Sequence, residues 1–549
     1  MKLKNILYSS LVALSLGLTG CDFGDENINP NYPADAATYM QFLYSSRFVR
    51  YFVFNSYYYD IWSQEYPGYL AESAKEQYGN MECTTQFSTV NYYAAAIRTL
   101  NEIMDQVDHA DAKDAMVNEW GDKNNQRAIC RTLRAFFYMS MTDVIGPTPY
   151  SEALKGASDN IWTPKFDNTD EIYAGLDKDL CEAYALFNAD SKMTNPTYDI
   201  FYQGDVTKWM KFNATLRMMM AIKMKDIDPE NGKERFVRAY NDGGMTDFSD
   251  SFTYTYDDNP SSTQNFSPMY SNANGIDKGC YNYVPTKIFV DSLKEYQDPR
   301  LFTYCDVSIN SYKGQAGAYG DKDFRSYHGV PFGLEEAELA SQSKYCCGVG
   351  PKYCKLKAKY GVITAARCLL VEAEASWLGW IAADTKQLYY DGIKASFEFE
   401  DYLELANLNR STFDYDLDAY CEQDRVKFSE NDSTQLLQIW AQRWLAGFLT
   451  DGVEAWADWR INNYPLIPVY DRQVASGHTT YPSRLKYSEA DYNYNVKNCE
   501  YAIQHYLGGD KDSRELRIWW DTKPNYSPAG ELMSSEELAT YKPAKTVKH

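Results

Sequence analysis

Apolar residues recur at helical spacing along most of the chain. Residues three or four positions apart lie on one side of a helix, so this spacing predicts amphipathic helices that need packing partners. The second of two early segments is expected to end at Gly146 and Pro147, which stop helices. The apolar faces of these two segments are Tyr93, Ile97, Leu100 and Met104, and then Ile129, Leu133, Phe136 and Phe137.

Side-chain caps predict where further helices begin. Asn168 is followed three residues later by Glu171, which is the spacing of a capping box. Asp205 precedes another apolar stripe, and two more helices are expected at residues 364–380 and 435–449. The predicted buried positions include Ile172, Leu176, Leu180, Trp209, Phe212, Leu216, Leu436, Ile439, Trp440, Trp444 and Phe448.

These patterns predict a mainly α protein. Antiparallel helix pairs would bury the apolar stripes against each other, although the sequence has no self-similar period of about 34 residues. Convincing alternating strands are few. Polar and aromatic stretches at residues 246–283 and 306–353 interrupt the helices, and long irregular loops of this kind are where a ligand is expected.

The N-terminal residues predict a lipoprotein signal peptide. Lys2 and Lys4 precede an apolar run from Ile6 to Leu18, which is shorter than the roughly 20 residues of a membrane-spanning helix. The run ends in LTGC, which is similar to the lipobox of bacterial lipoproteins. We therefore expect residues 1–20 to be removed and Cys21 to carry the lipid, whereas the alternative is an ordinary signal peptide with a chance cysteine.

The rest of the chain is expected to form one domain, residues 21–549, because no Pro/Gly/Ser linker or low-complexity segment divides it. No apolar run beyond Cys21 is long enough to span a membrane, so the lipid is the expected membrane anchor. The formal charge is −22. Nucleic acid and anionic membrane surfaces reward Lys and Arg, so neither is an expected partner, and a neutral ligand fits better.

Metal sites and cofactors are not expected. Cys346, Cys347 and Cys354 form the one cluster among twelve cysteines, but they lack zinc-ligand spacing, so buried free thiols are the favoured interpretation. The chain from Asp414 resembles the start of an EF-hand loop, yet Arg425 occupies the position of its last ligand. The oxygen-rich residues 257–259 are interpreted as a solvated turn rather than a cation site.

Signatures of catalysis are also missing. The sequence has no GxSxG, no Walker-type loop, no HExxH, and only five histidines. Its 76 acidic residues would supply carboxylate pairs in any fold, and none is marked for glycoside hydrolysis. The protein is therefore expected not to be an enzyme.

The aromatic content suggests a ligand class. The chain has 48 Tyr and 12 Trp against 25 Phe, and Tyr and Trp present an apolar face with a hydrogen-bonding edge. A pyranose ring has a complementary C–H face and polar rim. Most of these rings must coat helix junctions, but those beside turn-forming glycines and prolines are candidate ligand contacts. The predicted set is Tyr66 and Tyr69, then Tyr312, Tyr319, Asp323, Phe324, Arg325 and Tyr327.

Several motifs occur in the order typical of one family. The segment RTLRAFFYMSMTDVIGPTPYSEAL, residues 131–154, resembles the hallmark helix of SusD/RagB-type nutrient-binding lipoproteins. Further similar pieces are NINPNYP, FDNTDEIY, YQGDVTKWMKFNATLRMMMA, VEAEASWLGW, YYDGIKASF, GVEAWADWRINNYP, SRLKYSEADYNYN and RIWWD. Relatives commonly have two arginines and a glycine before YP, whereas this chain has Arg460 followed by Ile461, Asn462 and Asn463.

The resemblance implies a SusD-like fold with tetratricopeptide-like helix pairs on the outer face of an outer membrane. It also implies a glycan or oligosaccharide ligand that is delivered to a SusC-like TonB-dependent transporter. Capture of oligopeptides is the alternative within the family, and a surface glycan hydrolase is the alternative from another class.

Most motif residues are interpreted as structural. Arg131, Arg134 and Asp143 belong to one helix and are expected to lock a helix junction through ion pairs or carbonyl caps. Arg460 is expected to stack on the rings of Trp456 and Trp459 beneath the fold, with Asp458 as a charge partner.

Overall fold

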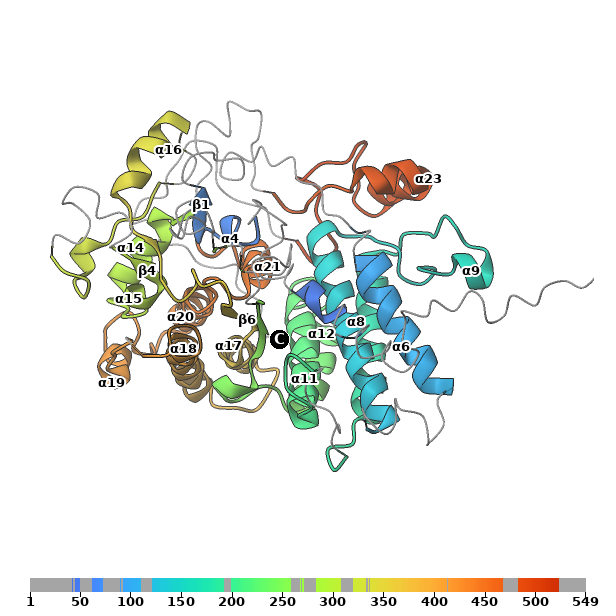
Figure 1. Cartoon of the computed structure of the whole chain (residues 1–549), viewed down its shortest axis with the longest axis horizontal. Coiled ribbons are helices and arrows are strands. Elements are labelled where there is room, and N and C mark those ends of the chain that lie inside the picture. The colour runs from blue at the N-terminus through green and yellow to red at the C-terminus, as the bar shows by residue number, and fades with distance from the viewer. Residues whose placement is uncertain are drawn as a thin grey trace, which may run out of the picture.

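The computed structural model describes residues 45–49, 62–72, 92–109, 121–191, 199–257, 283–307, 319–331, 336–411, 413–467 and 482–522, together with residues 42, 89, 267, 269, 270 and 334. The fold is mostly helical (Figure 1). The longer helices are α6 (Arg98–His109), α8 (Lys123–Ile145), α10 (Thr169–Leu186), α11 (Val206–Lys223), α12 (Pro229–Asp242), α14 (Lys287–Glu295), α17 (Ala365–Trp377), α18 (Thr385–Leu408), α20 (Asp432–Leu445), α21 (Gly452–Asn462) and α23 (Glu489–His505).

Short helical segments lie before and between the longer ones. They are η1 (Arg47–Val49), α4 (Trp62–Glu65), η2 (Tyr92–Ile97), α9 (Gly156–Asp159), η4 (Phe248–Asp250), α15 (Leu301–Tyr304), η6 (Phe324–Ser326), α16 (Glu336–Gln342), η7 (Ser343–Tyr345) and α19 (Leu417–Cys421). Several of these lie in the described parts of the stretches predicted as long loops, so those parts are less irregular than their composition indicates.

Helices begin where the sequence supplies a side-chain cap. Asn168 accepts a hydrogen bond at the start of α10 and Glu171 closes the capping box, as predicted. Asp205 likewise accepts from the backbone N–H groups of Thr207 and Lys208 at the start of α11. The predicted end of α8 at Gly146 is confirmed, with φ of 84° at that glycine.

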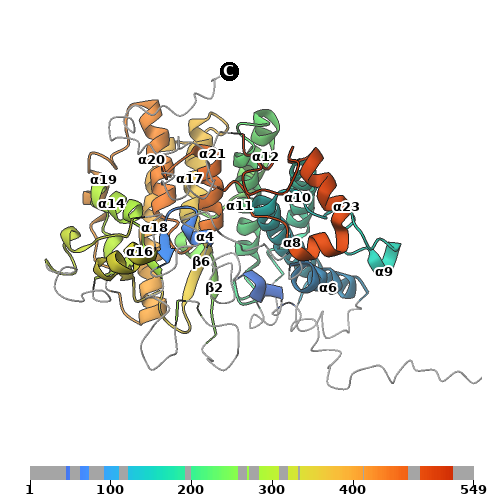
Figure 2. The same cartoon turned by 90° about the horizontal axis from the view of Figure 1, so that it is seen from above.

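Consecutive helices pack as pairs, as the mainly α prediction requires. α8 contacts both α6 and α10, α11 contacts α12, and α17 contacts α18. α11 also packs against α17, so the N-terminal helices and the later ones form one continuous body (Figures 1 and 2). No helix in the described part of the chain has the length and apolar character needed to cross a membrane.

The strands in the described residues are short and form three antiparallel pairs. β1 (Leu70–Glu72) pairs with β3 (Tyr283–Pro285), β2 (Phe252–Thr255) with β6 (Lys359–Ile363), and β4 (Cys305–Asp306) with β5 (Gly348–Val349). Each pair joins segments that are distant in the sequence. Phe252 in β2 stacks on Phe212 of α11 with 4.1 Å between ring centroids, which ties this sheet to the helical core.

The cysteine cluster is only partly as expected. Cys346 and Cys347 are buried free thiols, in agreement with the prediction. Cys354 is disulfide-bonded, so the expectation of a free thiol was wrong at that position. Spacing along the chain could not show this, because a disulfide depends on which residues the fold brings together.

Candidate functional site

Tyr66 and Tyr69 lie in the core rather than at a ligand surface. Tyr66 packs against Trp456 with 5.1 Å between ring centroids, and Tyr69 stacks on Trp444 at 5.5 Å. The Tyr69 hydroxyl donates to the carbonyl of Trp444 at 2.6 Å. Both tyrosines are fully buried, so the prediction that they contact a ligand is corrected: they fasten the turn after α4 to α20 and α21.

A second predicted group is exposed. Tyr319 has 58% of its surface accessible, and the Arg325 guanidinium lies 4.3 Å from its ring centroid. Asp323 accepts from Nε of Arg325 at 3.0 Å and from Nη2 at 2.6 Å. We call Tyr319, Asp323 and Arg325 the Tyr319 cluster. Its carboxylate holds the guanidinium over the aromatic ring.

Charge in the Tyr319 cluster is well defined. Hydrogen bonds from Arg325 lower the pKa of the Asp323 carboxyl to about 2. The same pairing raises the pKa of Arg325. Both groups are therefore ionised at every physiological pH, while 69% of the Arg325 side chain remains exposed. The cluster offers an aromatic face, a cation and a carboxylate next to one another.

Phe324 and Tyr327 form the base of this loop. The Phe324 ring lies 4.7 Å from Phe302 of α15, and the Tyr327 ring lies 5.6 Å from the same Phe302. Tyr327 is buried, and its hydroxyl donates to the carbonyl of Asp321 at 2.7 Å. The prediction that Tyr327 stacks on a ligand is therefore corrected, because its ring anchors the loop. Tyr312 lies outside the described residues.

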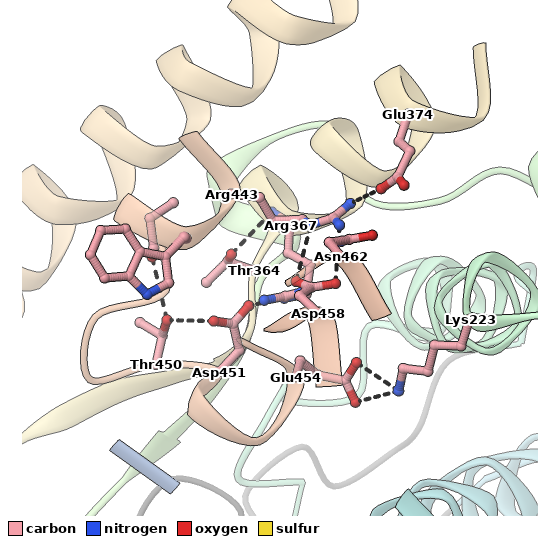
Figure 3. Close-up of polar contacts among 12 residues, drawn as sticks. Lys223, Thr364, Arg367, Glu374, Arg443, Thr450, Asp451, Glu454, Asp458 and Asn462 are labelled. Atoms are coloured by element: carbon pink, nitrogen blue, oxygen red, sulfur yellow. Dashed lines mark hydrogen bonds and ion pairs between the residues drawn. The ribbon is translucent and has the colours of Figure 1, made fainter. Parts of the chain in front are cut away.

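The C-terminal family motif lies in a buried polar network, shown in Figure 3. Arg367 of α17 pairs with Asp451 and, at 2.7 Å, with Asp458 of α21. Asp458 also accepts from Nε of Arg443 on α20 at 3.0 Å. These ion pairs join three helices. Asp458 was predicted to pair with Arg460, and instead it neutralises Arg367 and Arg443.

Glu374 extends the network. It accepts from Arg443 at 2.6 Å and also pairs with Lys225, which follows α11. Burial opposes ionisation of the carboxyl, but Lys225 and Arg443 outweigh it and lower the pKa of Glu374 to about 2. Lys225 donates to the amide oxygen of Asn462 at 2.6 Å. Asn462, which lies in the segment expected from the sequence to differ from the family pattern, therefore has a structural contact.

Lys223 forms a second buried centre. It donates to Asp143 of α8 at 2.7 Å and to Glu454 of α21 at 2.9 Å (Figure 3 shows the Glu454 contact). Asp143 also accepts from the Tyr173 hydroxyl at 2.5 Å. The predicted stacking of Arg460 is confirmed for Trp456, at 3.9 Å from the ring centroid.

The arginines of the first motif join two helices, as expected, but through other partners. Arg131 and Arg134 of α8 each donate to Asp179 of α10 at 2.7 Å, and Arg131 also reaches Glu182 at 2.6 Å. Asp143 pairs with Lys223 instead. The motifs therefore hold the helices together.

The lysines of this network were missed from the sequence. Lys223 and Lys225 follow the apolar run MMMAI and are buried. A lysine that directly continues an apolar helical stripe is buried and needs a carboxylate partner. A lysine in this position of the sequence is therefore the signal that could have identified Lys223 and Lys225.

With this geometry in place, the protein is a helix-pair protein that carries an exposed aromatic and charged loop. The chain belongs to the SusD-like family described as "Starch-binding associating with outer membrane", whose model matches residues 26–488. The resemblance predicted from the motifs is thereby confirmed. No curated protein matches the chain.

Solved structures show the same fold. A SusD homologue from Bacteroides fragilis NCTC 9343 is 20% identical with a TM-score of 0.71, and the alignment covers 87% of this chain and 99% of that one. A SusD homologue from Bacteroides uniformis ATCC 8492 is 22% identical with a TM-score of 0.65, covering 90% and 100%. A chitin-binding SusD homologue from Flavobacterium johnsoniae is 22% identical with a TM-score of 0.62, covering 89% and 99%. At these identities the likeness establishes the fold alone.

Proposed function

We propose that this protein is a surface-exposed outer-membrane lipoprotein that binds a glycan and delivers it to a SusC-like TonB-dependent transporter. Membership of the outer-membrane SusD-like family supports the location. The LTGC segment supports cleavage before Cys21 and lipidation of that residue. The chitin-binding relative from Flavobacterium johnsoniae supports a saccharide ligand. The observation that carries the ligand class is the exposed Tyr319 cluster.

The chemistry of this cluster suits a neutral sugar. The Tyr319 ring can stack on the C–H face of a pyranose, since aromatic rings present a large apolar face with a polar edge. The guanidinium of Arg325 can donate to ring hydroxyls, and the carboxylate of Asp323 can accept from them. Because Asp323 already holds Arg325 in place, little side-chain entropy is lost on binding.

Binding is favoured over hydrolysis. A general acid needs a raised pKa and access to the scissile bond. Burial raises the pKa of Asp521 to about 6 and that of Glu372 to about 7, but both carboxyls are buried, where a polymer does not reach them. The partly exposed carboxyl of Asp323 has a lowered pKa and stays ionised, which suits a hydrogen-bond acceptor rather than an acid.

The test is titration of the purified full-length protein with a panel of neutral oligosaccharides and oligopeptides, followed by product analysis. We expect reversible heat with an oligosaccharide and no new reducing ends. Heat with peptides alone would support the oligopeptide alternative, and released products would support the hydrolase. Co-purification of a large outer-membrane barrel with the tagged lipoprotein tests the transporter partnership.

A further inference from the structure

A second exposed aromatic surface lies far from the Tyr319 cluster. The loop from residue 148 to residue 167 is closed at its base by an antiparallel bridge, in which the N–H of Thr148 donates to the carbonyl of Asp167 at 3.2 Å and the reverse bond is 3.1 Å. The Asp167 carboxylate also accepts from the backbone N–H of Ser151 at 2.7 Å. The loop is therefore an ordered part of the fold, and Trp162 lies within it.

Trp162 is held in place although 71% of its surface is exposed. Its indole N–H donates to the side-chain oxygen of Asn160 at 2.8 Å. On one side the ring lies on Gly156, where an added Cβ would come within 2.8 Å of Cε3 and 2.9 Å of Cζ3. One ring face thus rests on the glycine, and the orientation of the indole is set before any ligand arrives.

Helix α23 supports this loop and adds another ring. Asn495 donates to the carbonyl of Pro164 at 2.6 Å, and Asn498 donates to the carbonyl of Thr163 at 3.0 Å. Asn495 is the residue at which α23 departs from helical geometry. Its neighbour in the chain, Tyr494, is 79% exposed, so a second exposed aromatic residue lies one position from the attachment point of the Trp162 loop.

We propose that Trp162 and Tyr494 form a second saccharide-binding platform that engages a long polysaccharide chain. Indole and phenol faces suit the C–H faces of sugar rings, and preorganisation lowers the entropy cost of binding. The formal charge of −22 favours a neutral chain over an acidic one. This inference rests on the proposed saccharide ligand and adds a site to it.

The position of the platform sets the expected size of the ligand. α9 and α23 lie at one end of the molecule, whereas α14 lies at the other end (Figures 1 and 2), together with α15, on which the Tyr319 cluster is anchored (Figure 1). A short oligosaccharide bound at the Tyr319 cluster is therefore not expected to contact Trp162 at the other end. A polymer can occupy both sites, and the second contact then acts at high effective concentration.

The test compares polymer with oligomer. The full-length protein is incubated with starch, chitin, xylan and mannan, and the hexasaccharide of each polymer that it retains is titrated separately. Stacking on an aromatic ring is worth about 1 to 3 kcal/mol per ring by analogy with nucleobases, so Trp162→Ala should weaken polymer binding roughly fivefold or more. Its affinity for the hexasaccharide should equal that of the parent. Tyr319→Ala should weaken both.

Two further variants separate stacking from folding. Trp162→Phe keeps a ring and should restore most of the polymer binding. Gly156→Val keeps the indole but displaces it from its contact with residue 156, so this variant should weaken polymer binding as Trp162→Ala does. Parent-like polymer binding by Trp162→Ala would overturn this inference and leave the proposed function standing. A parent that retains no polymer and binds no sugar would overturn both. If Trp162→Ala no longer co-purified with the transporter but bound the polymer like the parent, the proposal of a second saccharide site would also be overturned, because the surface around Trp162 would then be a protein interface.

Discussion

Replacing Glu374 by Gln removes one negative charge from the centre of the buried network. The side chain is buried between Lys225 and Arg443, and both cations lose their shared carboxylate in the variant. Breaking a buried ion pair by removing one partner costs about 3 to 5 kcal/mol. The lowered pKa gives a similar figure: a fall from 4.5 to about 2 corresponds to roughly 3 kcal/mol. We expect the free energy of unfolding to fall by about 3 kcal/mol.

The loss of stability caused by Glu374→Gln should become smaller as the pH falls. The folded-state pKa of Glu374 lies below its ordinary value, so its stabilising contribution is complete above pH 4.5 and decreases as pH falls toward 2. Glu374→Gln lacks this contribution at every pH. The difference in stability between parent and variant should therefore be constant above about pH 5 and smaller by about 1 kcal/mol at pH 3.5.

Urea unfolding followed by tryptophan fluorescence measures both effects. The matched control is Glu398→Gln on α18, where Lys394 lies 3.7 Å away and both side chains are partly exposed. That variant should change stability by less than about 0.5 kcal/mol. A loss below about 1 kcal/mol for Glu374→Gln at pH 7, or a loss that does not change on acidification, would refute the account of a network held by buried charge.

Two further predictions concern the core and the anchor. Trp444→Ala should lower the free energy of unfolding by about 3 to 5 kcal/mol, measured in the same urea assay, because it empties the site against Tyr69 and removes the indole bond to the carbonyl of Pro67 at 2.9 Å. A loss of less than about 1 kcal/mol in the free energy of unfolding would show that the surrounding side chains fill the space left by the indole. Cys21→Ser should abolish lipidation, seen by mass spectrometry, and move the protein out of the membrane fraction; attachment that persists without the transporter would reveal another anchor.

Much of the helical architecture could be predicted because its signals are local. The cap at Asn168, the stop at Gly146 and the apolar face that contains Trp444 depend on residues a few positions apart. The family could also be predicted from the sequence, since the order of its motifs along the chain is itself the signal. The short sheets were not, because each pairs segments far apart in the sequence.

The candidate site was predictable only in part. Tyr66, Tyr69 and Tyr319 are all near turn-forming glycines in the sequence, yet the first two are buried and the third is exposed. What buries Tyr69 is Trp444, hundreds of residues away. The role of Trp162 could not be predicted from the sequence either, because its exposure and its contact with Gly156 are properties of the folded loop.

Calorimetric titration of the parent and of Tyr319→Ala with the oligosaccharide identified in the panel tests the central claim most directly. Tyr501→Ala is the matched control, because this exposed tyrosine lies on α23 at the other end of the molecule (Figure 1). We expect Tyr319→Ala to weaken binding by about 1 to 3 kcal/mol without lowering the melting temperature, and Tyr501→Ala to bind like the parent. Parent-like binding by Tyr319→Ala would place the ligand elsewhere and contradict the account.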